Sequence, residues 1–115
     1  MNKIKLVINN EAKKKEREKF FIKQELQSIL NLYAKMVSNG SWKDYSFTSG
    51  IKEVSFDVYQ RASEKPVLRI LKNLKPKYFN EKYLIKDKNG AVLKKSENLN
   101  QLISKTSWNK LKLVK

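Results

Sequence analysis

The stretch Val54-Ser55-Phe56-Asp57-Val58-Tyr59 decides the fold of this chain. Its large apolar residues at every second position alternate with a hydroxyl, a carboxylate and a tyrosine. A period of two is typical of a β-strand that buries one face, and this is the clearest strand signal in the sequence. The segments on either side are expected to supply its neighbours in a sheet.

The segment before this stretch is predicted to pair with it. Residues 42–48 place Tyr45 and Phe47 on one side of a strand, which Ser49-Gly50 closes. Two alternating segments joined by a short glycine-containing turn form a β-hairpin. We therefore expect the first two strands to be antiparallel neighbours.

The segment after it is predicted to continue the sheet. Pro66 opens a third strand over residues 67–71, because proline cannot donate to a ladder and is tolerated at a strand start. Lys75-Pro76 ends that strand. Asp87-Lys88-Asn89-Gly90 is a strong hairpin signal, since Asn and Gly accept positive φ, and it predicts strands over residues 82–86 and 91–94.

Helices are predicted at both ends of the sheet. An apolar stripe at helical spacing predicts a helix of about 17 residues, followed by the left-handed stop Asn39-Gly40. The stripe consists of Ile22, Leu26, Ile29, Leu30, Tyr33 and Val37. Ser96 is expected to cap a short second helix that carries Leu99, Leu102 and Ile103, and residues 111–114 permit a short terminal strand.

The predicted fold class is α+β. It has an N-terminal amphipathic helix, an antiparallel meander of four to five strands, and a short C-terminal helix and tail. Residues 1–19 mix Lys, Glu and Asn without an apolar period and are expected to be a flexible basic arm. Residues 20–115 are expected to form a single α+β domain, since 115 residues suffice for one modest core.

The composition argues against an enzyme, a metal site or a cofactor. The chain has no Cys and no His, which removes thiolate metal sites, the commonest metal ligand and the usual general base near neutral pH. The three glycines lie too far apart for a phosphate-binding loop, and no carboxylate pair has a catalytic setting. We see neither a signal peptide nor a membrane-spanning length, so we expect a cytoplasmic protein with no integral membrane segment.

The net charge of +15 suggests an anionic partner, and it is unevenly placed. Residues 21–64 carry five basic and five acidic groups, whereas residues 65–115 carry fourteen basic and three acidic groups. A field of this sign favours nucleic acid. Codon bias toward A and T is the alternative explanation, because the chain holds 23 Lys and 11 Asn.

The candidate anion-binding residues lie mainly in the basic C-terminal half. They are Arg61, Arg69, Lys72, Lys75, Lys77, Lys82, Lys86, Lys94 and Lys95. Tyr78 and Phe79 lie among these lysines and are possible stacking platforms for bases, although an aromatic beside a strand is more often a core residue. Trp42 and Trp108 are expected to pack in the core.

The segment Arg61 to Arg69 leaves two interpretations open. Arginine makes bidentate contacts with phosphate or carboxylate that lysine cannot copy, so these residues suggest a ligand contact. Either arginine could instead pair with Glu64 in a turn that leads into the third strand.

Four separated motifs give the chain a resemblance to a known family. They are Leu26-x-x-Ile29-Leu30-Asn31-Leu32-Tyr33, Gly40-x-Trp42-x-Asp44-Tyr45, Arg61-Ala62-Ser63-Glu64-x-Pro66-x-x-Arg69-Ile70 and Gly90-x-Val92-Leu93. Over residues 20–114 the pattern resembles a family of short basic alphaproteobacterial proteins classed as a domain of unknown function. The resemblance implies a fold and a bacterial cytoplasm, and it transfers no catalytic residue.

These observations predict a small, non-enzymatic protein that binds nucleic acid, RNA more than DNA, through a Lys-rich C-terminal face. The alternative is a protein-interaction or regulatory module that uses the segment Arg61 to Arg69 to bind an acidic protein partner. A weaker third possibility is contact of residues 12–23 with an anionic membrane surface. The oligomeric state is left open.

Overall fold

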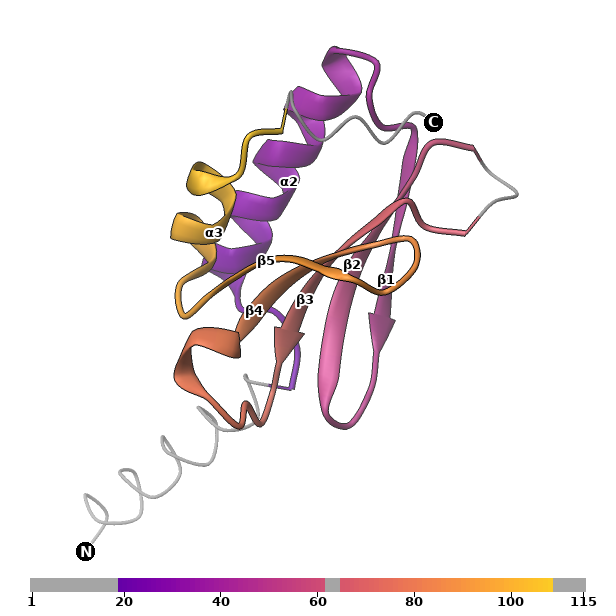
Figure 1. The fold of residues 1–115 in the computed structure, drawn as a ribbon. Helices are drawn as coiled ribbons and strands as arrows, with labels where there is room; N and C mark the ends of the chain where they lie inside the picture. Colours follow the sequence, from indigo (N-terminus) through magenta and orange to yellow (C-terminus); the bar gives the residue numbers. More distant parts are fainter. Residues whose placement is uncertain (1–18, 62–64, 109–115) are drawn as a thin grey trace, which may run out of the picture.

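The computed structural model describes residues 19–61 and 65–108, which form an α+β fold (Figure 1). The elements in chain order are α2 (Lys23–Ser38), β1 (Asp44–Ser49), β2 (Glu53–Tyr59), β3 (Leu68–Asn73), the short 3₁₀ turn η1 (Phe79–Glu81), β4 (Tyr83–Asp87), β5 (Val92–Ser96) and α3 (Leu99–Lys105). The predicted fold class is confirmed. The expected terminal strand and most of the expected basic arm lie outside the described residues.

The five strands form one antiparallel sheet in the order β1-β2-β3-β4-β5, so each strand pairs with its neighbours in sequence. The hairpin expected from the first two strands is confirmed, with Phe47 opposite Phe56. A register shift between Ile85 and Lys86 interrupts the pairing of β4 with β5. The sheet is twisted, and β5 runs across the direction of β1 and β2 (Figure 1).

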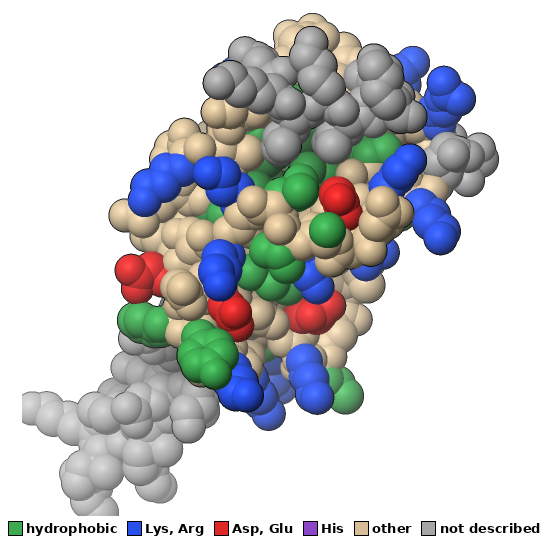
Figure 2. Space-filling view, in the orientation of Figure 1, with side chains coloured by type: hydrophobic (Ala, Val, Ile, Leu, Met, Phe, Trp, Pro, Cys, Tyr) green, Lys and Arg blue, Asp and Glu red, His purple; other side chains and the backbone are tan. Residues whose placement is uncertain are grey.

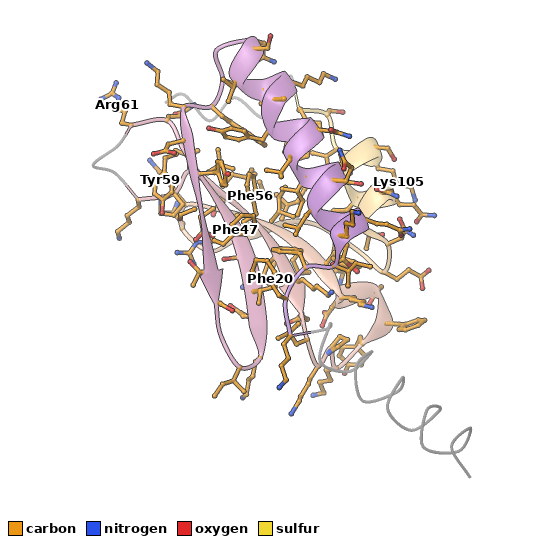
Figure 3. All side chains as sticks on the ribbon, turned by 180° about the vertical axis from the view of Figure 1, so that it is seen from behind. Phe20, Phe47, Phe56, Tyr59, Arg61 and Lys105 are labelled. Carbon is orange, nitrogen blue, oxygen red and sulfur yellow. The ribbon has the colours of Figure 1, made fainter. Side chains whose placement is uncertain are left out.

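Both helices pack on one face of the sheet. The apolar side of β2, with Val54, Phe56 and Val58, is fully buried, and it belongs to one core cluster with residues of α2 and α3 such as Ile29 and Leu102. Phe47 and Phe56 point between the strands and α2 (Figure 3). Removal of apolar surface from water across this single layer is the main stabilising contribution.

The tryptophans lie in or against this core, as expected. Trp42 is 2% exposed, and its ring meets the ring of Trp108 edge to face with centroids 5.7 Å apart. Trp108 is half-buried and donates from Nε1 to the carbonyl of Ile103 at 2.9 Å. Trp42 precedes β1, which begins at Asp44, so the predicted start of that strand was two residues early.

The turns follow the chemistry of their residues. Helix α2 ends at Ser38 with Asn39 as its C-cap, and Gly40 adopts a φ of +83°, which fits the predicted left-handed stop. Gly90 has a φ of +86°, and the Asp87 carboxylate accepts the backbone N–H groups of Asn89 and Ala91 at 2.9 Å. This closes the β4–β5 hairpin where the sequence predicted it.

The predicted cap of the second helix is wrong by two residues. Asn98, not Ser96, is the N-cap of α3, and its side chain accepts the backbone N–H of Gln101 at 3.0 Å. Ser96 is the last residue of β5, and its hydroxyl accepts the N–H of Asn98 at 3.1 Å. The sheet therefore extends to the residue that was expected to begin the helix.

Candidate nucleic-acid interface

One end of the sheet gathers four lysines and two aromatic rings, which we call the basic tip. It consists of Lys52, Lys75, Lys77, Lys82, Tyr78 and Phe79. The β1–β2 turn and the connection from β3 to β4 both lie at this end because the strands are antiparallel (Figure 1). The N–H of Leu74 donates to the carbonyl of Lys52 at 2.8 Å and ties the two connections together.

The connection from β3 to β4 is held by its own hydrogen bonds. Asn73 donates from its backbone to the carbonyl of Lys82 at 2.7 Å and from its side chain to the carbonyl of Glu81 at 2.6 Å. The N–H of Glu81 donates to the carbonyl of Tyr78 at 3.0 Å and shapes η1. The basic tip therefore has a defined backbone on which its side chains are presented.

The two rings of the basic tip face solvent. Tyr78 is 57% exposed and Phe79 is 76% exposed, although an aromatic in this position is usually a core residue. The Lys77 ammonium lies 5.7 Å from the centre of the Tyr78 ring. Exposed rings beside lysines are the arrangement on which bases stack while phosphates meet the cations.

The remaining predicted residues do not join the basic tip. Arg61 is exposed at the opposite end of the sheet, where its side chain extends away from the body (Figure 3). Lys94 is exposed on the edge strand β5, and Lys95 pairs with Glu81 at 3.6 Å. Arg69 and Lys86 lie directly opposite each other on neighbouring strands.

Arg69 has an acidic partner that the sequence did not reveal. Its Nε lies 3.4 Å from Oδ1 of Asp57, which is 1% exposed. The predicted alternative partner, Glu64, lies outside the described residues. Asp57 also accepts hydrogen bonds from Thr48 Oγ1 at 2.5 Å and Ser55 Oγ at 2.7 Å, so its carboxylate is well satisfied.

Lys72 is buried and does not belong to any exposed basic surface. Only 1% of the residue is exposed, and its ammonium lies 2.9 Å from Oε1 of Glu25 and donates to the carbonyl of Phe20 at 3.0 Å. The same carboxylate accepts the hydroxyl of Tyr83 and, at 2.8 Å, the N–H of Ile22. This cluster joins the start of α2 to β3 and β4, so the predicted ligand role of Lys72 is replaced by a structural one.

The basic residues are spread over the surface rather than joined in one face. Figure 2 shows Lys and Arg side chains scattered over this face, with acidic and apolar side chains between them. The basic side chains named above therefore lie in separate places: at the basic tip, on the face of the sheet that carries Arg69 and Lys86, and at the opposite end with Arg61.

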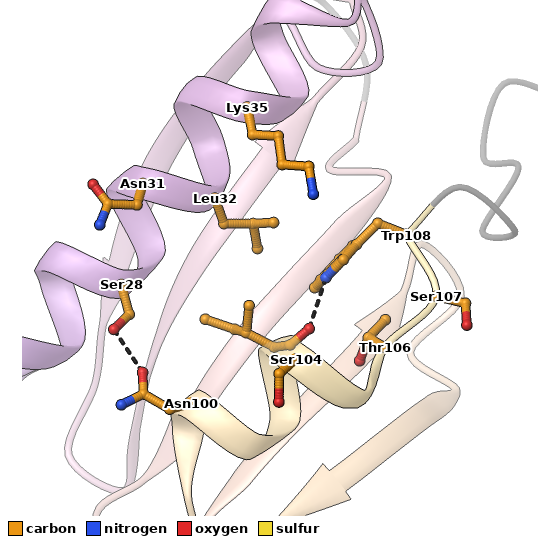
Figure 4. Close-up of a pocket in the computed structure, with 10 residues that line it drawn as sticks. Ser28, Asn31, Leu32, Lys35, Asn100, Ser104, Thr106, Ser107 and Trp108 are labelled. Atoms are coloured by element: carbon orange, nitrogen blue, oxygen red, sulfur yellow. Dashed lines mark hydrogen bonds between the residues drawn. The ribbon is translucent and has the colours of Figure 1, made fainter.

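A groove of about 680 Å³ lies between α2 and α3 (Figure 4). A hydrogen bond of 2.7 Å from Ser28 to Asn100 crosses it, and Lys35 is the single charged side chain among the described residues that line it. None of the described residues that line this groove carries a carboxylate. Among residues 19–61 and 65–108, no three acidic side chains cluster as a metal site would require.

The helices of the described segments can be compared with what a membrane-spanning helix requires. None of them is both long enough and apolar enough to cross a bilayer.

The comparisons with known proteins give a family and no individual relative. No curated protein and no solved structure matches the chain. A match to a protein family covers residues 19–103, which include α2, all five strands and most of α3. The chain therefore belongs to the family described as Protein of unknown function (DUF2794).

Proposed function

We propose that this protein is a non-enzymatic, cytoplasmic protein that binds single-stranded nucleic acid, RNA more than DNA, at the basic tip. The observation that supports the proposal is the exposure of Tyr78 and Phe79, at 57% and 76%, beside lysines on a hydrogen-bonded connection. Unpaired bases offer the planar faces that such rings stack against, and double-stranded nucleic acid does not present them.

The charge of the basic tip suits the backbone of a single strand. Lys52, Lys75 and Lys77 are exposed, and among the described residues none of them has an ion-pair partner. Each lysine that neutralises a phosphate releases counterions, so affinity falls with salt. The proposed binding has one stacking component and one electrostatic component that can be measured separately.

The stacking component is tested with Tyr78→Ala combined with Phe79→Ala. A labelled single-stranded oligouridylate is titrated with each protein and followed by fluorescence anisotropy. Stacking on an aromatic side chain contributes about 1–3 kcal/mol per base, so we expect the double variant to bind at least about tenfold more weakly. The exposed Val37 provides a matched control, because Val37→Ala removes apolar surface on α2, away from the basic tip.

The electrostatic component is tested with Lys75→Gln combined with Lys77→Gln. The control, Lys88→Gln combined with Lys105→Gln, removes the same charge from exposed positions elsewhere. We expect the basic-tip variant alone to lower the slope of log affinity against log salt by about 1.4, at about 0.7 per phosphate contact on a single strand. Equal slopes for the two variants, with unchanged binding by the ring variant, would reject the proposal.

A pull-down from native cells separates the proposal from its alternative. RNA that co-elutes and is removed by ribonuclease supports it. Recovery of one acidic protein that resists nuclease and is lost in an Arg61→Gln variant would favour the protein-interaction module instead.

A further inference from the structure

The face of the sheet that the helices do not cover carries an ordered row of charged groups. The register places Asp57 opposite Arg69 and Arg69 opposite Lys86 on neighbouring strands. Side chains directly opposite each other in an antiparallel sheet point to the same face. Arg69 and Lys86 are therefore adjacent like charges, an arrangement that destabilises a sheet, and Asp57 offsets it on the Arg69 side.

The buried carboxylate of Asp57 lies beside the Nε end of the Arg69 guanidinium. Asp57 is held by Thr48 and Ser55 and pairs with Nε of Arg69 at 3.4 Å. The side chain of Arg69 is 45% exposed, and its two Nη nitrogens make no hydrogen bond to any described residue. They form the planar fork with which arginine binds phosphate.

A hollow adjoins this row beside the register shift between β4 and β5. Its volume is about 540 Å³, and Leu84, Val92 and Leu93 supply apolar walls. Lys86, Lys94 and Lys95 supply its cations and Glu81 its one acid. Among the described residues, the row and the hollow contain four basic and two acidic groups, so described acidic side chains leave two of these positive charges unbalanced.

We propose that Arg69 and Lys86 bind the phosphate of a phosphomonoester whose organic body rests in the hollow. A phosphomonoester carries a charge of about −1.5 to −2 at neutral pH, which matches the local excess better than a carboxylate or a backbone phosphodiester, each with a single charge. The site lies on the sheet face rather than at the basic tip, so it stands independently of the proposed function. The ligand is a free nucleotide or the terminal phosphate of a strand, which share this chemistry.

The site is tested by NMR titration of the isotope-labelled protein with adenosine monophosphate, with dimethyl phosphate as the phosphodiester analogue. We expect adenosine monophosphate to shift the amide signals of Arg69, Lys86 and Val92 and dimethyl phosphate to bind much more weakly. A 5′-phosphorylated oligonucleotide that binds more tightly than its 5′-hydroxyl form would identify the source as a strand end. Equal binding of the two, with retained binding of the mononucleotide, identifies a free nucleotide.

The variants are expected to keep the fold, so that a loss of binding cannot be mistaken for unfolding. Lys86→Gln removes a side chain with no ion-pair partner among the described residues, and Lys88→Gln removes the same charge from the adjacent turn. Arg69→Lys keeps the charge and loses the fork. We expect Lys86→Gln and Arg69→Lys each to weaken adenosine monophosphate binding about tenfold or more, because each variant loses a charge-assisted hydrogen bond to the phosphate. Lys88→Gln should leave the binding unchanged.

Three results would overturn the proposal. They are wild-type affinity in both Lys86→Gln and Arg69→Lys, equal affinity for dimethyl phosphate, and signal shifts confined to the basic tip. The combined Tyr78→Ala and Phe79→Ala variant should bind adenosine monophosphate as the wild type does, which separates this site from the nucleic-acid interface.

Discussion

Lys72 is a single residue on which the junction between α2 and the sheet depends. Its ammonium offsets the Glu25 carboxylate at 2.9 Å in a buried setting. Removing one partner of a buried ion pair leaves an uncompensated charge, so we expect Lys72→Met to lower the free energy of unfolding by about 3–5 kcal/mol. Urea denaturation measures this loss.

Lys75→Met is the matched control for that measurement, because Lys75 is an exposed lysine three residues further on. A surface substitution of this kind changes stability by no more than about 0.5 kcal/mol. If both variants lose the same small amount, the Lys72 ammonium is not enclosed. Adding Glu25→Gln to Lys72→Met should recover part of the loss, since the orphaned charge is then removed.

Tyr33 gives a prediction about alkaline pH. Burial raises the pKa of its hydroxyl, and the negative charges of Asp44 and Tyr45 raise it further. Since the folded pKa lies above the unfolded value of about 10, folding favours the protonated hydroxyl, which donates to the carbonyl of Lys43 at 3.2 Å. This contribution is complete below the unfolded pKa and is lost as pH rises through the folded pKa.

We therefore expect Tyr33→Phe to reduce the dependence of stability on pH above about pH 10. Urea denaturation at a series of alkaline pH values, compared between the variant and the wild type, measures the difference. Parallel curves for the two proteins would contradict the raised pKa.

The burial of Lys72 and the partner of Arg69 were not predicted from the sequence. Leu68, Ile70 and Lys72 alternate on one strand, so a period of two carries Lys72 to the buried side. The predicted strand ended at Leu71, so the alternation was not extended to Lys72. Glu64, nearby in the chain, was the predicted alternative partner of Arg69, whereas the β2–β3 register brings Asp57 opposite it.

At the scale of the elements, the start of α3 provides a test. The Asn98 side chain accepts the N–H of Gln101, a group with no partner inside the helix, whereas Ser96 accepts only the N–H of the cap residue. We expect Asn98→Ala to cost about 1 kcal/mol and Ser96→Ala to cost less. Thermal unfolding gives the order of the two variants, and the reverse order would place the cap at Ser96.

The elements themselves were largely predictable, because hydrophobic period and turn chemistry are local properties of the chain. The helix stop at Gly40 and the hairpin at Gly90 require positive φ, and the sequence supplies residues that adopt it. The register shift between β4 and β5 was not predictable. Leu93, Lys94 and Lys95 do not alternate, so their pattern contains no information about the pairing.

At the scale of the whole molecule, one core joins the helices to the sheet. Trp42 belongs to that core, and Trp108 packs against it. We expect tryptophan fluorescence and far-ultraviolet circular dichroism to report the same unfolding midpoint in urea, as a two-state domain does. Two separate midpoints would show that the tryptophan end of the helix layer opens independently of the sheet.

The distribution of charge is also a property of the whole molecule, and the sequence predicts its amount but not its arrangement. Lysines close together in the chain lie in different places, because β3 directs Lys72 to the core and ends at Asn73, before Lys75. Lys72 is buried, whereas Lys75 lies at the basic tip three residues later. The composition therefore predicts that the protein has a basic interface, but only the fold shows which lysines belong to it.

The enclosure of Lys72 gives the protein an internal reporter of its own opening. Amine-acylating reagents modify a lysine only when its nitrogen is accessible and deprotonated, so exposed residues such as Lys75, Lys77 and Lys88 should be labelled first. Lys72 can be acylated only after α2 separates from β3 and β4. Mass spectrometry of that one peptide would therefore time the opening of the domain in a mixture as complex as a cell extract.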